Sequence, residues 1–156
     1  MERNLKRNKL LAAVVAAVMI VSLFPAAAMA EGNVCAIGTQ EYPTLGEAVT
    51  AANPGDTIRF LDSGNLSGNI AINKNLTFDL DGHTVNLSAT GIALTVSGAA
   101  LTLENAGAFN VEGTVCGVNV IGPSASATVT SAAATGTSEP IAALAKNGGT
   151  LTVTGN

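Results

Sequence analysis

The sequence predicts an all-β protein: a parallel solenoid, or parallel β-helix, in which each coil of about 25 residues supplies three short strands and a short α-helix caps the N-terminal end. Three observations predict this fold. After Asp56, short runs rich in Thr, Val, Ile and Leu are interrupted by Gly, Asn and Ser every six to ten residues. These runs repeat with one period, which is typical of solenoids. A single amphipathic helix pattern precedes them.

Residues 1–30 have the layout of a secretory signal peptide. A basic start is followed by an apolar run of about 15 residues, LLAAVVAAVMIVSLF, and then by the small-residue cleavage pattern Ala28-Met29-Ala30. The run is shorter than the roughly 20 residues that span a bilayer. We expect cleavage after Ala30 and export to the cell surface or the extracellular space, with an uncleaved membrane anchor as the alternative.

The composition after the signal limits the possible partners. Residues 31–156 carry three basic and ten acidic side chains, a net charge of −7, with one Tyr and three Phe. They offer neither the basic surface nor the aromatic platform that nucleic-acid binding needs, so nucleic acid is excluded as a partner. Their 126 residues suffice for one domain with one core. We expect no membrane span after signal cleavage.

Residues 31–56 are predicted to form an N-terminal cap. The stretch EGNVCAIG alternates in polarity, which indicates a first strand. Thr44 and Glu47 have the spacing of a capping box, and an Asn-Pro-Gly segment from residue 53 ends the pattern. The spacing predicts a helix over residues 45–52 with one face to bury. Its apolar stripe comprises Leu45, Ala48, Val49 and Ala52.

Two columns of apolar residues recur through residues 57–156. The segments NLTFDLDG, ALTLENAG, SATVTSAA and TLTVTGN align with spacings of 25, 26 and 24 residues. The segments GIALTVSG, GVNVIGPS and PIAALAKN keep the same period. Two phased columns indicate strands that stack from coil to coil. The first column is Leu76, Leu101, Ala127 and Leu151, and the second is Ile92, Val118 and Ile141.

Strand alternation assigns the neighbours of the first column to two faces. Aliphatic residues point inward and fill a narrow core, while a row of threonines points outward. Threonine rows occur on ice-binding solenoids, yet threonine is also common on any exposed strand face. The inward set adds Phe78, Leu103, Val129 and Val153, and the outward set is Thr77, Thr102, Thr128 and Thr152.

The segments EYPTLGEAVTAANPGDTIRFLDSG and IAINKNLTFDLDGHTV resemble the right-handed parallel β-helix proteins of the pectate-lyase-like superfamily. There, a short amphipathic helix covers the N-terminal end of the solenoid, and a GDTI strand and a first full coil follow. The resemblance covers residues 34–85 and implies a right-handed coil. It implies fold more than function, because the superfamily includes polysaccharide lyases, hydrolases and adhesins.

Asp79, Asp81 and Glu104 form the most reactive arrangement that the repeat predicts. The alignment places Asp79 and Glu104 at the same outward position of adjacent coils, with Cβ atoms about 5 Å apart. Such carboxylates repel each other, and a Ca²⁺ ion bound by their oxygens would relieve the repulsion. Solvent screening would relieve it as well. The sequence leaves open a calcium site at these three residues or no cofactor.

His83, the single histidine of the chain, follows Asp81-Gly82. A histidine beside an acid suits a general base, but the repeat places it at a corner between two strands, and we predict a corner residue bonded to backbone. Cys35 and Cys116 have no histidine nearby. We interpret both as free buried cysteines, with a disulfide as the alternative that export permits.

The resemblance implies what an enzyme of this superfamily would need. Its lyases use a calcium cluster of aspartates beside a basic residue, and its hydrolases use several aspartates with a histidine on neighbouring coils. This chain has no Asp after Asp81, and Arg59, its single arginine after the signal, belongs to the first coil.

We therefore expect a secreted or cell-surface segment with a structural or binding role, adhesin-like or polysaccharide-binding, without a complete active site. The chain stops at TLTVTGN, within a repeat, so we expect the first part of a longer solenoid, the alternative being a last coil that pairs with a partner. The other functional hypothesis is the N-terminal part of a polysaccharide lyase or glycoside hydrolase whose catalytic coils follow Asn156. The ligand and the oligomeric state stay open.

Overall fold

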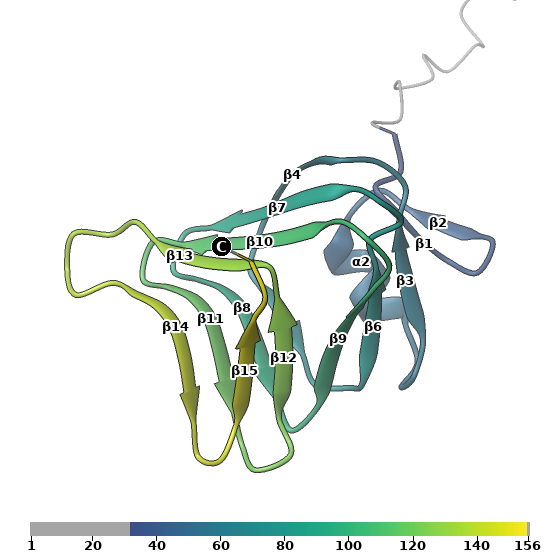
Figure 1. The fold of residues 1–156 in the computed structure, drawn as a ribbon. Coiled ribbons are helices and arrows are strands. Elements are labelled where there is room, and N and C mark those ends of the chain that lie inside the picture. Colours follow the sequence, from purple (N-terminus) through teal and green to yellow (C-terminus); the bar gives the residue numbers. More distant parts are fainter. Residues whose placement is uncertain (1–31, 156) are drawn as a thin grey trace, which may run out of the picture. The chain divides into compact units, whose positions relative to one another are not determined.

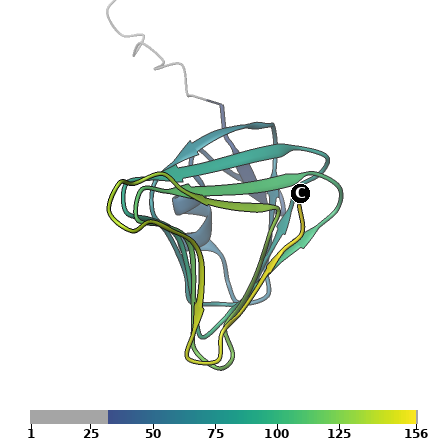
Figure 2. The same ribbon diagram turned by 60° about the vertical axis from the view of Figure 1, so that its left-hand side comes forward.

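The computed structural model describes residues 32–155, which form a β-solenoid (Figure 1). Each full coil contributes one strand to each of three sheets, and the coils superpose into a three-sided outline in the turned view (Figure 2). The predicted all-β parallel solenoid is confirmed. The predicted signal peptide, residues 1–30, lies outside the described residues. Within residues 32–155 no helix has the length and apolar character to cross a membrane.

The three sheets are built from strands about one coil apart in sequence. The first sheet contains β1 (Cys35–Ile37), β2 (Gln40–Tyr42), β3 (Thr57–Phe60), β6 (Leu76–Asp79), β9 (Ala100–Glu104), β12 (Ser126–Val129) and β15 (Thr150–Val153). The second sheet contains β4 (Gly64–Ser67), β7 (Thr84–Ala89), β10 (Ala108–Gly113) and β13 (Ser131–Ala134). The third sheet contains β5 (Ile70–Ile72), β8 (Ile92–Ser97), β11 (Cys116–Ile121) and β14 (Ile141–Lys146).

The register of the first sheet follows the predicted column. Leu101 pairs with Leu76 on one side and with Ala127 on the other, and Ala127 pairs with Leu151. Val153 holds its place in the register but is 46% exposed, because β15 is the outermost of the described strands in this sheet. The repeat therefore predicted the stacking correctly.

The predicted register of the third sheet is wrong by two residues. Cys116, not Val118, pairs with Ile92 and with Ile141. Val118 pairs instead with Leu94 and, on its other side, with a residue of β14. The error has a simple reason: side chains alternate with a period of two, so a shift by two residues leaves the same side chains inward and the apolar pattern unchanged.

The predicted helix of the cap is α2 (Leu45–Ala51), one residue shorter than expected because Ala52 already has extended ψ. Thr44 is the N-cap: its hydroxyl oxygen accepts the Glu47 N–H at 3.2 Å and the hydroxyl donates to the Glu47 carboxylate at 3.2 Å. The predicted apolar stripe is buried throughout. Its exposed fractions are Leu45 3%, Ala48 0%, Val49 7% and Ala52 5%.

Two antiparallel strands complete the cap. β1 pairs with β3 and with β2 in antiparallel fashion, whereas all other strand pairs described are parallel. The strand predicted in EGNVCAIG is confirmed at Cys35–Ile37. β2 was not predicted, because its three residues, QEY, are too polar and too few to show a strand pattern. The hairpin covers the N-terminal edge of β3, which would otherwise expose unpaired backbone groups.

Lys74, which follows β5 in the chain, binds the C-terminal end of the capping helix. Its ammonium group donates to the carbonyl oxygens of Val49, Thr50 and Ala52 at 3.0, 3.3 and 2.8 Å. The last carbonyls of a helix have no partner within the helix, and they carry its partial negative charge. Lys74 therefore ties α2 to the solenoid through three charge-assisted hydrogen bonds.

Lys74→Met is expected to lower the free energy of unfolding by about 1 to 3 kcal/mol, because methionine keeps the apolar stem but leaves the helix carbonyls without their donor. Urea denaturation followed by circular dichroism measures the change. Lys146→Met is the matched control, since Lys146 is exposed in β14 and should change stability by less than about 0.5 kcal/mol. Equal effects of the two substitutions would show that the cap bonds contribute nothing specific.

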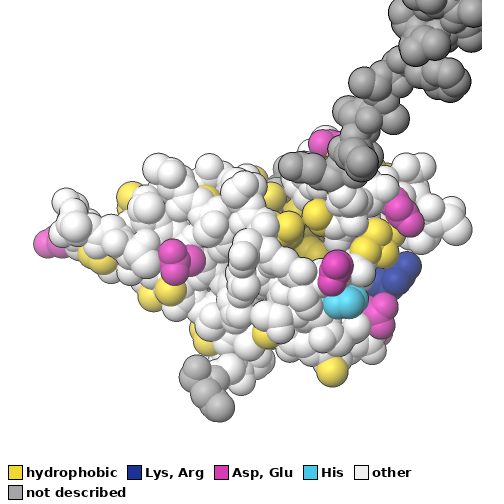
Figure 3. Space-filling view, turned by 90° about the horizontal axis from the view of Figure 1, so that it is seen from above, with side chains coloured by type: hydrophobic (Ala, Val, Ile, Leu, Met, Phe, Trp, Pro, Cys, Tyr) yellow, Lys and Arg dark blue, Asp and Glu magenta, His cyan; other side chains and the backbone are white. Residues whose placement is uncertain are grey.

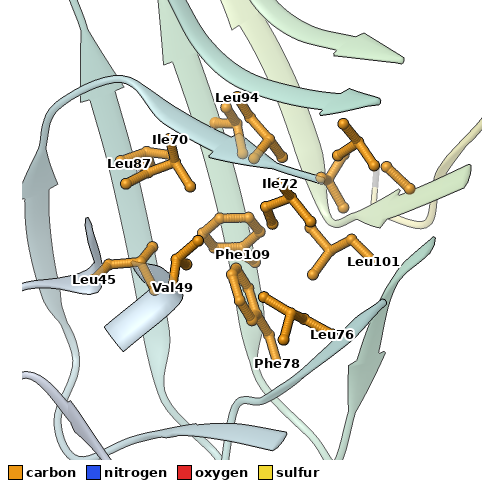
Figure 4. Close-up of a cluster of buried hydrophobic side chains, with 14 of the residues drawn as sticks. Leu45, Val49, Ile70, Ile72, Leu76, Phe78, Leu87, Leu94, Leu101 and Phe109 are labelled. Atoms are coloured by element: carbon orange, nitrogen blue, oxygen red, sulfur yellow. The ribbon is translucent and has the colours of Figure 1, made fainter. Parts of the chain in front are cut away.

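The core is not as purely aliphatic as the composition suggested. Phe60, Phe78 and Phe109, at most 1% exposed, contact one another inside the first coils. Phe78 meets Phe60 and Phe109 edge to face, with ring centroids 5.6 and 5.3 Å apart. Leu45 and Val49 of the cap lie near this cluster in the close-up (Figure 4). The aromatic cluster therefore joins the first and second sheets beneath the capping helix.

Cys35 and Cys116 are free and buried, which confirms their interpretation as small apolar residues. Burial, with a smaller effect of the Glu47 charge, raises the pKa of the Cys35 thiol to about 11. Burial also raises the pKa of Cys116, and the nearby Lys146 partly offsets this. Neither thiol is therefore suited to act as a nucleophile near neutral pH.

The raised pKa of Cys35 predicts a loss of stability at alkaline pH. Above pH 9 the unfolded chain releases the thiol proton, while the folded chain holds it up to about pH 11. Across this interval the free energy of unfolding should fall by about 2 to 3 kcal/mol as pH rises, at about 1.4 kcal/mol per pKa unit. Cys35→Ala should lack this part of the fall. Identical pH profiles of the two proteins in urea denaturation would contradict the assignment.

Candidate functional site

The acidic residues predicted to form a site are partly brought together. Asp79 pairs with Glu104 on the outward face of the first sheet, as the repeat predicted, and Arg59 pairs with Asp79 on the other side. Asp81 lies in the turn after β6 and makes an ion pair with Arg59 at 3.4 Å. Both side chains of this pair are about half exposed, 46% and 54%, so the pair adds little stability.

Hydrogen bonds from neighbouring groups of the chain surround the Asp79 carboxylate. Its Oδ1 atom accepts the backbone N–H of Asp81 at 3.0 Å and the side-chain amide of Asn105 at 2.7 Å. Asp81 and Asn105 have positive φ, 46° and 61°, so two successive turns place donors beside the same carboxylate. In residues 32–155 no group of three or more His, Cys, Asp and Glu side chains has an arrangement able to hold a metal ion. Calcium at Asp79, Asp81 and Glu104 stays a prediction.

His83 lies in the turn between β6 and β7, at the predicted corner. Its backbone N–H donates to the Leu80 carbonyl at 2.7 Å, and its carbonyl accepts the N–H of Ala108 in the next coil at 2.9 Å. Gly107 packs against this turn, where a Cβ atom would overlap the His83 carbonyl oxygen. The backbone of His83 thus has a structural role in stacking one turn on the next.

The outward threonines of the first sheet pair on two sides of the row as predicted, whereas the pairing of β9 with β12 ends one residue before Thr102 and Thr128. The structure adds Thr57 at the start of the row. Thr77 pairs with Thr102, and their hydroxyl oxygens are 3.0 Å apart; Thr128 pairs with Thr152. Two residues further along the strands the first three coils carry charges instead of threonine. The regular threonine surface is therefore one residue wide over most of its length.

A second row, on the outward face of the second sheet, was not predicted. We call it the amide row: one outward side chain from each of four stacked strands, in register through the whole sheet. Each side chain after the first donates to the one in the coil before it. The amide of Asn86 donates to Asn65 at 3.0 Å, that of Asn110 to Asn86 at 2.9 Å, and the hydroxyl of Ser131 to Asn110 at 2.8 Å.

The amide row keeps hydrogen-bonding capacity for a ligand. A side-chain amide has two N–H donors and an oxygen that accepts two bonds. Asn86 and Asn110 each use one donor and one acceptor within the row. One donor and one acceptor per residue remain, in fixed directions, because the bonds along the row hold every amide in the same orientation. Both side chains are half-buried, so these groups are partly accessible to solvent.

Two adjoining hollows lie over the second sheet, and we call them together the second-sheet groove. The larger, about 460 Å³, includes Ser67, Asn69, Ser88, Thr90, Glu112 and Thr114. The other, about 300 Å³, includes Asn65, Asn86, Ser88, Asn110, Glu112 and Ser131. Both contain Ser88 and Glu112, which pair on β7 and β10. Seen from this side, most of the surface consists of uncharged polar side chains and backbone (Figure 3).

Glu112 is the charged residue of this groove. It is exposed, and its register neighbours, Ser88 and Ala133, are small and uncharged. In residues 32–155 the ion pair found joins Arg59 to Asp81, and it does not involve Glu112. The groove therefore combines neutral amides and hydroxyls with one carboxylate.

Compared with known proteins, the chain matches no protein-family model, no curated protein and no solved structure. Function is therefore inferred from the chemistry of the two outward faces. The first sheet places charged side chains beside a threonine row, whereas the second sheet places an amide row beside one carboxylate. Of the two faces, the second carries the two hollows of the second-sheet groove.

Proposed function

We propose that this protein is a secreted or cell-surface β-solenoid that binds polysaccharide on an outward sheet face without cleaving it. The observation that carries the proposal is the amide row: in-register hydrogen-bonding side chains, one per coil, along an open groove. Sugar hydroxyls both donate and accept hydrogen bonds, which matches amides that keep one donor and one acceptor.

The solenoid suits a polymeric ligand because its surface groups repeat. Strands of successive coils lie about 4.8 Å apart, so the amide row presents equivalent groups at that interval along the solenoid axis. A linear polysaccharide likewise presents equivalent hydroxyls from unit to unit. The bonds along the row also fix the amide side chains before binding, so that less side-chain conformational entropy is lost when a ligand binds. Binding by several weak, repeated contacts is the mode that this geometry supports.

Membership of the pectate-lyase-like superfamily belongs to the same proposal. The proposal is supported by where the motifs that resemble the superfamily lie in this chain: the amphipathic segment is α2, the GDTI segment enters β3, and LTFD is β6. Export follows from the predicted signal peptide. Under this proposal the described coils bind the ligand, and the chain has the fold of the superfamily but does not catalyse the lyase reaction.

The purified protein should be incubated with insoluble polysaccharides of different composition, and the unbound fraction should be measured. We expect depletion by at least one polysaccharide, with no new reducing ends and no unsaturated product in the supernatant. Clear turnover would overturn the binding role in favour of an enzyme. Failure to bind any polysaccharide tested, by a protein with the circular dichroism spectrum of a β fold, would contradict the proposal.

A further inference from the structure

We infer that the second-sheet groove selects uncharged polysaccharides and rejects polyuronates, and that Glu112 is the residue that makes this choice. The inference rests on the proposed polysaccharide binding and adds the class of ligand and the residue that determines it. Three features of the structure carry it: the position of Glu112, the charges around it, and the chemistry of the remaining lining.

The position of Glu112 makes it unavoidable for a ligand in the groove. It belongs to both hollows, and it lies two residues beyond Asn110 on the same outward face of β10. A chain that contacts Asn86 and Asn110 therefore passes within reach of the Glu112 carboxylate. Ser88 and Ala133, its neighbours in the adjacent coils, are too small to cover it.

The surrounding charges do not neutralise this carboxylate. The linings of the two hollows contain no Lys, Arg or His. Residues 31–156 carry a net charge of −7, so the field of the whole chain opposes an anionic ligand as well. A polyuronate, with one carboxylate on each sugar, would meet like charge at Glu112 and no cation to offset it.

The same features favour a ligand with hydroxyl groups alone. A carboxylate accepts strong hydrogen bonds from hydroxyls; Ser88 adds a hydroxyl beside it, and Ser67 adds another one coil further away. The amide row supplies donors and acceptors that carry no charge. The groove thus provides hydrogen bonds for a neutral sugar chain, while the face of the first sheet, with Arg59, Asp79 and Glu104 in one column, is charged.

The test measures affinity by isothermal titration calorimetry for a soluble neutral polysaccharide, such as a mannan or a xylan without acidic side groups, and for polygalacturonate. We expect the protein to bind the neutral chain at least tenfold more tightly. Asn110→Ala should weaken neutral binding by about tenfold, the effect of one lost hydrogen bond. Thr102→Ala, in the threonine row of the first sheet, is the matched control and should leave it unchanged.

Glu112→Lys decides the role of the carboxylate. Because the side chain is exposed, the variant should fold, and its circular dichroism spectrum checks this. It should bind polygalacturonate at least tenfold more tightly than the unmodified protein, with an affinity that falls as salt is added. If Glu112→Lys does not gain polygalacturonate affinity, or if the unmodified protein already prefers polygalacturonate, the inference fails and polysaccharide binding stands. If neither polymer binds to either protein, the proposed function fails as well.

Discussion

Phe78→Ala is expected to lower the free energy of unfolding by about 3 to 5 kcal/mol, the usual cost of removing a fully buried aromatic ring. Phe78 is 0% exposed and meets Phe60 and Phe109 edge to face. Aromatic pairs of this kind add about 0.5 to 1.5 kcal/mol beyond their buried area. The three rings come from β3, β6 and β10, so the loss affects the contact between successive coils, on which solenoid stability depends.

Urea denaturation of Phe78→Ala, followed by circular dichroism, measures this loss. Phe78→Leu keeps most of the volume and should cost less, about 1 to 2 kcal/mol. Thr77→Ala is the control on the outward face of the same strand; it removes the hydroxyl contact with Thr102 and should cost about 1 kcal/mol or less. A loss below 1 kcal/mol in Phe78→Ala would mean that the aromatic cluster is not the centre of the core.

Val49→Asp is expected to have the second large effect, a sharp fall in the soluble fraction and a loss of about 3 kcal/mol or more. Val49 is 7% exposed and belongs to the face of α2 that packs on the core. An aspartate there would need either to bury a charge or to lift the helix away. Lifting the helix would expose the apolar first coil, a surface prone to aggregation.

The control for Val49→Asp is Thr50→Asp, the next residue on the exposed face of the same helix. A negative charge near a helix C-terminus should cost less than about 1 kcal/mol there. Soluble expression and the thermal unfolding temperature are the two measurements. If both variants behave like the unmodified protein, α2 does not protect the end of the solenoid.

The fold could be predicted from the sequence because its signals are local and repeated. The period of about 25 residues, the alternation of Leu76, Thr77 and Phe78, and the capping box of α2 each reflect a short stretch of chain. Contacts between residues far apart in the sequence leave no local pattern from which they could be predicted. The bonds from Lys74 to the end of α2 and the packing of Phe60 on Phe109 depend on how the coils stack. A single lysine or phenylalanine in the sequence does not indicate its partner.

The candidate site was predicted only in part for a related reason. The pairing of Asp79 with Glu104 followed from the repeat, but the donors that surround Asp79 come from turns with positive φ, whose shape the pattern does not show. The amide row was missed because its members are 21, 24 and 21 residues apart, unlike the period of the first sheet. Because the turns differ in length, the sequence spacing of these residues is irregular and does not show that they are in register. The available signal was an asparagine at a polar position in several successive alternating segments.

The side-chain amide region of the ¹H–¹⁵N NMR spectrum, recorded while a soluble neutral polysaccharide is added, tests most directly whether the amide row binds sugar. We expect the side-chain amide signals of Asn86 and Asn110 to shift progressively and to saturate, because these groups would donate to the ligand. The signals of Asn75 and Asn105, which bond to a backbone N–H of β9 and to the carboxylate of Asp79 in the first sheet, should stay in place. Shifts confined to Asn75 and Asn105, or no shifts at saturating polysaccharide, would contradict the assignment of the binding site to the second sheet.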